Sequence, residues 1–116
     1  MKFTILGQPC SKANSRRLVR FGNKPAFIKS AKALQYEKDF AAQCPFRSEL
    51  FERDVSVTIT IYYQSRRPDL DESVILDCMQ DYIYKNDRQV KEKHIFWGGV
   101  DKKNPRADIE VEEIDE

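Results

Sequence analysis

Between residues 55 and 62, apolar and polar side chains alternate without interruption. Successive side chains of a β-strand point to opposite faces, so this period of two predicts a strand with one buried face and one solvated face. A sheet containing such a strand needs other elements to cover its apolar side. The alternation therefore requires a layered fold, with the sheet core formed by Val55, Val57, Ile59 and Ile61.

Two segments predict helices that can cover this sheet. The first begins after Ser30, a residue type that caps helix N-termini, and runs to about Cys44, with Pro45 just beyond it. Its apolar side carries Ala33, Tyr36, Phe40, Ala41 and Cys44. The second helix runs from about Ser73 to Tyr84. Its apolar stripe, which places Cys78 inside, consists of Val74, Ile75, Cys78, Met79, Tyr82 and Ile83.

Shorter strand signals surround these helices. Residues 3–6 and 107–112 are strand-like, and the acidic side of 107–112 is interpreted as a solvated or edge face. Residues 18–28 predict two short strands around a turn at Gly22-Asn23, and residues 90–97 predict a strand that ends at Gly98-Gly99. The element order predicts one α+β domain, residues 1–116, with two helices packed on a mixed, mostly antiparallel sheet.

The composition argues against several classes of protein. Hydrophobic residues make up 41% of the 116 residues, enough for a globular core, and no apolar run approaches the roughly 18 residues of a membrane span. Three widely spaced cysteines and one histidine, His94, disfavour a zinc site and a disulfide framework. We interpret His94 as a structural residue of its strand. A reducing cytoplasm is the expected location.

The net charge of +1 hides a strong segregation along the chain. Residues 1–32 contain eight basic side chains and no acid, whereas residues 33–116 contain 12 basic and 19 acidic side chains, a net charge of −7. A basic segment of this kind indicates a polyanionic partner. A basic surface without a partner is the alternative, and composition alone leaves both open.

Three acids are crowded into the segment RRPDLDES, residues 66–73. Pro68 favours extended geometry in its neighbours, which would direct Asp69 and Asp71 to the same side, roughly 6–7 Å apart along the chain. Hard oxygen ligands without histidine or cysteine suit Mg²⁺ or Mn²⁺. The alternative is that Asp71 caps the second helix, with Glu72 in its first turn.

Two further features favour the metal site. Asp87 follows the second helix, which would span about 18 Å, so Asp87 can join the acid pair only where the chain doubles back. Arg66 and Arg67 directly precede the acids and could hold phosphate groups beside a metal ion.

The segment RRPDLDE…LDCMQDYIYKNDRQV resembles the signature of RusA-type Holliday-junction resolvases of bacteria and phages. The opening GQPCSKANSRR resembles the N-terminal loop of that family, and the resemblance covers roughly residues 3 to 112. It implies a homodimeric, Mg²⁺-dependent crossover junction endonuclease of DNA recombination and repair, encoded by a bacterium or phage. It also implies that Asp69, Asp71 and Asp87 are the catalytic, metal-binding acids, with Mn²⁺ as a possible substitute and Asp77 as a further family acid.

The chain departs from the family pattern at two positions. Glu72 stands where the family usually has asparagine, and it could serve as an additional ligand or simply begin the helix. Ile75 stands where the family has a functional lysine. Either Arg66, Arg67 or Lys85 supplies the missing cation, or the chain is a weakened or inactive DNA-binding protein. A small regulatory module whose acids only cap a helix is a third hypothesis.

The basic N-terminal stretch is the expected DNA contact, because the acids alone would repel DNA. Its phosphate-binding candidates are Lys12, Asn14, Arg16, Arg17 and Arg20, together with Arg66 and Arg67. Two cuts on opposing strands require two active sites, which favours a twofold dimer. Core packing is expected for Phe3, Phe27, Phe40 and Phe96.

Overall fold

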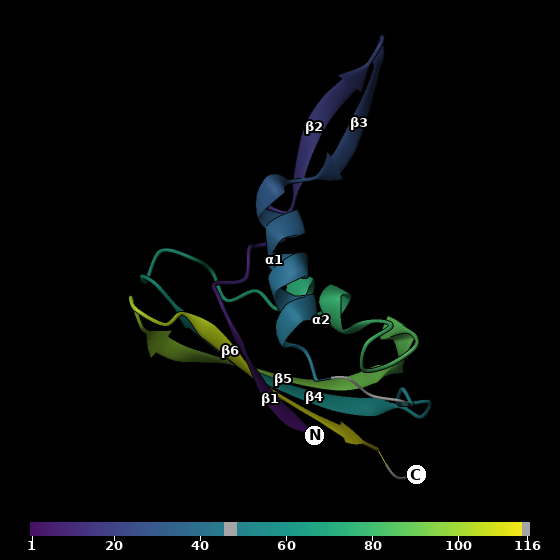
Figure 1. Ribbon diagram of the computed structural model, residues 1–116, viewed down its shortest axis with the longest axis vertical. Helices are drawn as coiled ribbons and strands as arrows, with labels where there is room; N and C mark the ends of the chain where they lie inside the picture. The colour runs from purple at the N-terminus through teal and green to yellow at the C-terminus, as the bar shows by residue number, and fades with distance from the viewer. Residues whose placement is uncertain (46–48, 115–116) are drawn as a thin grey trace.

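The computed structural model describes residues 1–45 and 49–114, in which two helices cover one face of a four-stranded sheet (Figure 1). The sheet order is β1-β6-β4-β5. Strand β4 pairs in parallel with β5 and antiparallel with β6, which in turn pairs antiparallel with β1. The α+β class with a mixed, mostly antiparallel sheet is therefore confirmed. The four strands are β1 Lys2–Leu6, β4 Val55–Tyr63, β5 Val90–Val100 and β6 Arg106–Glu113.

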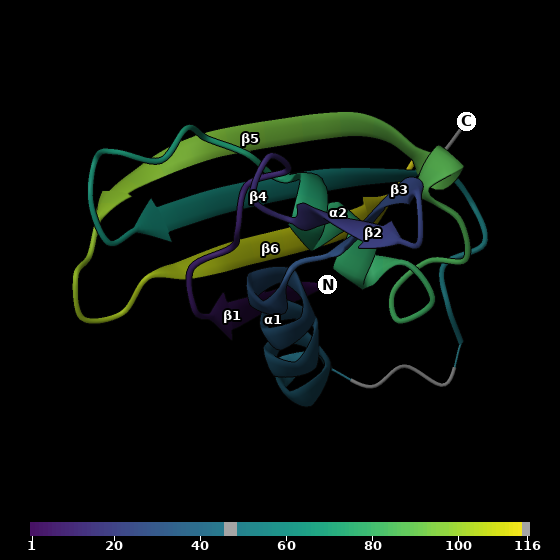
Figure 2. The same ribbon diagram turned by 90° about the horizontal axis from the view of Figure 1, so that it is seen from above.

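The alternation that predicted a strand produces the core. Every second residue of β4 is buried, and the series continues through Tyr63, which is 2% exposed. Side chains of β6 join the same layer from the neighbouring strand, and both helices pack on it (Figure 2). The buried strand residues are Val55, Val57, Ile59, Ile61, Tyr63, Ala107, Ile109 and Val111.

Helix α1, Ala31–Gln43, begins and ends where the sequence predicts. The Ser30 side chain accepts a hydrogen bond from the Ala33 backbone N–H, as an N-cap does. Tyr36 and Phe40 are buried against the sheet, and Phe40 meets Phe3 of β1 edge to face. Ala41 was expected on this apolar side but is exposed, because it lies one position past Phe40 on the solvent side of the helix.

Helix α2 is shorter than predicted: it covers Ser73–Met79 and not the whole stretch to Tyr84. The chain leaves helical geometry at Gln80, and Asp81 takes a positive φ of 72°. The Asp81 backbone N–H then donates to the Tyr84 carbonyl at 2.7 Å, which closes a tight turn. Because of this turn, the two tyrosines lie opposite to the prediction. Tyr82, predicted on the apolar stripe, is 48% exposed, whereas Tyr84 is fully buried.

Strand β5 does not end at Gly98-Gly99 but continues through both glycines to Val100. A Cβ at Gly98 would lie 2.7 Å from the Tyr62 ring, so the glycine allows that ring to pack across the strand. Strand β6 is not an edge, because it lies between β1 and β4. Its acidic side faces away from the core and carries Asp108, which accepts a 2.8 Å hydrogen bond from the Thr4 hydroxyl.

A separate β-hairpin projects beyond α1, away from the four-stranded sheet (Figure 1). It consists of β2, Arg16–Phe21, and β3, Lys24–Lys29, and turns at Gly22, where φ is 64°. The predicted turn is therefore confirmed. Two core assignments are wrong, because Phe27 on this hairpin is 69% exposed and Phe96 on β5 is 54% exposed. No helix among the described residues is long and apolar enough to cross a membrane.

Candidate active site

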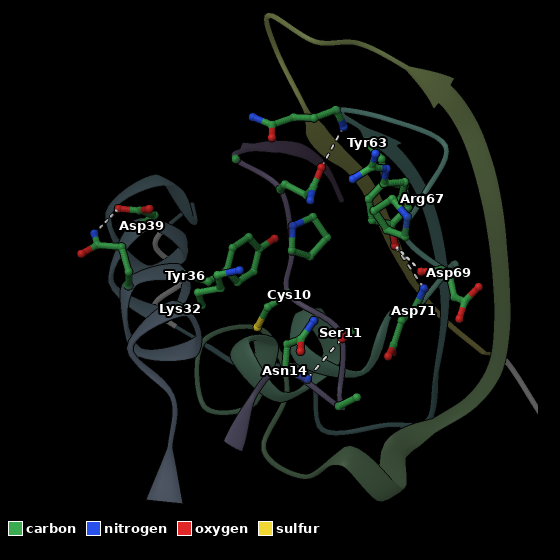
Figure 3. A pocket seen from close by; sticks show the side chains of 17 residues that line it. Cys10, Ser11, Asn14, Lys32, Tyr36, Asp39, Tyr63, Arg67, Asp69 and Asp71 are labelled. Atoms are coloured by element: carbon green, nitrogen blue, oxygen red, sulfur yellow. Dashed lines mark hydrogen bonds between the residues drawn. The ribbon is translucent and has the colours of Figure 1, made fainter. Parts of the chain in front are cut away.

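The loop from Gly7 to Ser15 brings the N-terminal segment to the acids that precede α2 (Figure 3). Gly7 has a φ of 109°, and its backbone N–H donates to the Pro105 carbonyl at 2.9 Å. The Gln8 side chain accepts from the Gln64 backbone N–H at 2.7 Å, just past the end of β4. These bonds hold the loop across the C-terminal end of β4, where the segment with Asp69 and Asp71 begins.

Tyr63, the last residue of β4, shapes the acidic segment. Its hydroxyl donates to the Asp69 carbonyl and accepts from the Asp71 backbone N–H, both at 3.1 Å. Its ring stacks on Trp97 with centroids 4.9 Å apart. Burial raises the pKa of Tyr63, so the hydroxyl remains protonated and able to donate near neutral pH. The core strand thereby fixes the backbone between the two aspartates.

The Asp71 carboxylate is held by three hydrogen bonds. Oδ2 accepts from the Lys12 backbone N–H at 2.8 Å, and Oδ1 accepts from the Ser73 N–H and hydroxyl at 2.9 and 2.6 Å. Partial burial acts to raise the pKa of Asp71, but these bonds to the charged form outweigh it and lower the pKa below its ordinary value. Asp71 is therefore ionised at neutral pH, and Oδ2 retains a free acceptor position.

The same hydrogen bonds test the alternative that Asp71 only caps helix α2. Asp71 does bond the first residue of α2, Ser73, so a structural role at the helix start is real. The residue at the N-cap position is Glu72, which makes no side-chain capping hydrogen bond. The Glu72 carboxylate instead pairs with Lys93 of β5 at 3.2 Å. Asp71 therefore supports the helix through Oδ1, while Oδ2 faces the N-terminal loop.

Asp69 and Asp71 line one pocket, of about 790 Å³, between α1, the N-terminal loop and the segment after β4 (Figure 3). Arg67 lines it beside the acids, Asn14 lines it from the loop, and Lys32 lines it from α1. In Figure 3 the carboxylates of Asp69 and Asp71 leave the chain in different directions rather than to one side. Irregular backbone over residues 67–72, in place of an extended strand, accounts for this difference.

Asp87 lines a neighbouring pocket of about 320 Å³, together with Glu72 and Asp77. A one-turn helix, η1 Asp87–Gln89, positions it. The Asn86 side chain accepts from the Arg88 N–H, and the Gln89 side chain accepts from the Asn86 N–H as in a capping box, both at 2.9 Å. Three cations line the same pocket, namely Lys12, Arg16 and Lys93.

The structure thus brings Asp69 and Asp71 into one pocket and Asp87 into the next. The loop residue Lys12 lies between them, because its N–H binds Asp71 while it also lines the pocket of Asp87. Within residues 1–45 and 49–114, no three histidine, cysteine or acidic side chains lie close enough together to hold a metal ion. Metal binding by Asp69, Asp71 and Asp87 stays a prediction.

Ile75, the position that the resemblance aligns with the family lysine, faces the core. Its side chain is fully buried and lines neither pocket. Among the cations expected to replace the lysine, Arg67 lines the first pocket, whereas Arg66 lines neither of the two. Lys85 forms a salt bridge with Glu52, in which Nζ lies 2.7 Å from the carboxylate oxygen Oε1.

Two residues of the site escaped the sequence analysis. Lys93 lies beside Glu72 in the pocket of Asp87. It falls within the strand predicted over residues 90–97, but no local signal in the sequence places it near the acids. Tyr63 continues the period of two from Val55 to Ile61 by one further step. Arg17 and Arg20 lie on the exposed hairpin rather than in either pocket.

Comparison with known protein families gives an independent result. The family model for endodeoxyribonuclease RusA matches residues 7–112. A search of curated proteins finds no match to this chain. The matched region includes the N-terminal loop, the hairpin, both acidic pockets and the whole of α2. The chain therefore belongs to the RusA family of endodeoxyribonucleases, hydrolases that act on DNA junctions.

Proposed function

We propose that this protein is an active, Mg²⁺-dependent endonuclease that hydrolyses phosphodiesters at four-way DNA junctions. The family supplies the general activity and its general dependence on a metal. The observation that carries the proposal is the Asp71 carboxylate, which is ionised, fixed on Oδ1 by Ser73 and open at one acceptor position of Oδ2. It lies where two acid-lined pockets meet cations of the N-terminal loop.

The donor chemistry fits a hard divalent ion. We propose Asp69, Asp71 and Asp87 as its ligands, with Glu72 as an additional candidate, because carboxylate oxygens are the ligands that Mg²⁺ and Mn²⁺ prefer. When bound, such an ion supplies positive charge against the phosphate oxygens and lowers the pKa of a water molecule. The Tyr63 hydroxyl supports this role, since it fixes the backbone on both sides of Leu70.

The cations around the pockets have a separate task in this proposal. Lys12, Arg16 and Lys93 line the pocket of Asp87, and Arg67 lines the pocket of Asp69. We assign them to phosphate oxygens on either side of the cut, because DNA would otherwise be repelled by the acids that line the two pockets. Lys93 takes the place of the family lysine in this scheme, since Ile75 is buried and cannot.

We also propose that two copies act together. A four-way junction has twofold symmetry, and its resolution requires cuts on two opposing strands. A dimer presents two sites in a fixed relation, so the second cut can follow before the DNA dissociates.

An inactive junction-binding protein is the second candidate, and the observation in its favour is the buried isoleucine at the lysine position. A labelled four-way junction, incubated with the protein and Mg²⁺, Mn²⁺ or EDTA, separates the two. Paired nicks with Mg²⁺ and none in EDTA are the expected result. Stable junction binding without nicks under any metal would favour the inactive protein.

A further inference from the structure

The β2–β3 hairpin exposes apolar side chains that the core does not use. On one face, Leu18 and Phe27 form a cross-strand pair and are 56% and 69% exposed. Near the tip and on the opposite face, Phe21 is 67% exposed. A two-stranded hairpin has no second layer that could cover such side chains, and these two strands pair only with each other within the described residues. Exposed aromatic clusters of this kind indicate a binding surface.

Cations surround the apolar pair on the same face. In an antiparallel ribbon, Arg16 and Lys29 form the pair on one side of Leu18–Phe27, and Arg20 opposes Pro25 on the other side. The hairpin also carries Arg17 and Lys24, and residues 16–29 contain five basic side chains and no acid. The ligand that fits such a face is a polyanion with apolar flat surfaces inside, which is the chemistry of nucleic-acid bases behind their phosphates.

The base of the hairpin is part of the candidate active site. Ser15 and Arg16 line the pocket of Asp87. The Ser30 N–H donates to the Ser15 carbonyl at 2.9 Å and the Ser30 hydroxyl donates to the Asn14 carbonyl at 2.7 Å, which anchors both strands to α1. Six extended residues span roughly 20 Å, more than the ~8.5 Å depth of the major groove of DNA. DNA seated on the pockets would therefore bring its branch point within reach of the hairpin.

We propose that this hairpin inserts into the DNA at the branch point and that Leu18, Phe27 and Phe21 contact bases unstacked there, while the flanking cations hold the phosphates. This inference rests on the proposed function, because it assigns the feature by which that activity recognises a branch rather than a plain duplex. Base pairs within a duplex are stacked and shielded, whereas those at a branch lose a stacking neighbour. An apolar wedge consequently favours the branch.

The test compares two variants in EDTA, where binding is measured without cleavage. Leu18→Thr/Phe27→Thr removes the apolar pair and keeps strand propensity and charge. Leu34→Gln/Tyr82→Gln is the matched control, since these side chains are 46% and 48% exposed outside the hairpin. Trp97 fluorescence reports the fold of the body in each protein. The probes are a four-way junction with 2-aminopurine beside the branch and a linear duplex of equal length.

We expect the wild type and the control to raise the 2-aminopurine fluorescence and to prefer the junction. The hairpin variant should lose the rise and about tenfold or more of its junction affinity, with duplex affinity nearly unchanged. An unchanged fluorescence rise and an unchanged junction preference in this variant would overturn the hairpin assignment alone. A changed oligomeric mass of this variant, with equal loss of affinity for both DNAs, would also overturn the assignment. It would show that the hairpin binds a second copy of the chain instead. A wild type that binds neither DNA would overturn the proposed function as well.

Discussion

The backbone N–H of Lys12 donates a 2.8 Å hydrogen bond to Oδ2 of Asp71, across 59 positions of the chain. This bond ties the N-terminal basic segment to the start of α2. It also lies at the border between the pocket of Asp69 and the pocket of Asp87. A change in the loop is therefore transmitted to a carboxylate that we place at the centre of the reaction.

The substitution Asp71→Asn tests that role. We expect cleavage of a four-way junction to be lost, because a neutral amide oxygen binds Mg²⁺ more weakly than a charged carboxylate does. Junction binding should be kept or become tighter, since one negative charge near the phosphates is removed. Gel-based cleavage and equilibrium binding in EDTA measure the two effects.

Asp39→Asn is the matched control, because Asp39 lines the same pocket from α1 and is not in the proposed ligand set. It should leave cleavage within about twofold of the wild type. Loss of folding and of binding together in Asp71→Asn, detected by thermal unfolding, would instead support a purely structural role at the start of α2.

The pH dependence of stability reports the hydrogen bonds of Asp71. Their effect lowers the pKa of this carboxyl in the folded protein, although partial burial acts in the opposite direction. The unfolded state therefore binds the proton more readily. The stabilisation is present above pH about 4 and is lost as pH falls through the lowered folded pKa. Urea unfolding should show a gap between wild type and Asp71→Asn at pH 6 that narrows towards pH 3. A gap independent of pH would contradict this assignment.

Restoring lysine at position 75 should not restore a family site. Ile75 is fully buried, so Ile75→Lys places an unpaired ammonium in the core and should cost about 3 kcal/mol or more of unfolding free energy. Ile75→Val, the conservative control, should cost about 1 kcal/mol. Chemical denaturation measures both. A stable lysine variant with faster cleavage would show that the side chain reaches the pocket after all.

Lys93 is the cation that we expect to replace that lysine. Lys93→Gln should lower the cleavage rate by about tenfold to a hundredfold, because positive charge beside the reacting phosphate is lost. Lys91→Gln is the control, since Lys91 is an exposed lysine of β5 outside both pockets. Single-turnover cleavage separates the effect from DNA affinity. Equal cleavage rates for the two variants would mean that another residue supplies the positive charge beside the phosphate.

Salt dependence reports the cations of the N-terminal segment. If about six of them bind phosphates, log K should fall with log salt at a slope near −5. Arg17→Gln/Arg20→Gln removes two exposed hairpin cations and should reduce the slope by about 2. Fluorescence anisotropy over a salt series gives both slopes. An unchanged slope would mean that the hairpin does not touch DNA phosphates.

The local sequence pattern was sufficient to predict those elements whose conformation depends on neighbouring residues alone. The alternation from Val55 to Ile61 predicted β4 correctly, because a strand with one buried face needs nothing more than its own period. Helix α1 followed from the Ser30 cap, since capping is a local hydrogen bond. The turn at Gly22 could also be predicted from the sequence, because glycine tolerates the positive φ that the hairpin turn needs.

Elements decided by distant contacts were harder to predict. The apolar stripe from Val74 to Ile83 is compatible with a long helix, yet α2 ends at Met79. There the chain turns so that Ile83 and Tyr84 enter the core separately, and the Ile83 carbonyl accepts from the Phe51 N–H. From the sequence, Gly98 was likewise predicted to end its strand. In the structure the strand continues through Gly98, and the Tyr62 ring packs over this glycine, where a larger residue would not fit.

The amino-acid sequence alone established the class of fold and the charge segregation, because each depends on neighbours along the chain. It also nominated Asp69, Asp71 and Asp87 as metal-binding acids, which stays a prediction. Tertiary structure alone decided which acids share a pocket, that Ile75 faces the core and that Phe27 faces solvent. The physical reason is that these properties depend on the paths of the loops before and after α2. Those paths are set by hydrogen bonds between residues far apart in the chain, such as Lys12 with Asp71 and Gln8 with Gln64.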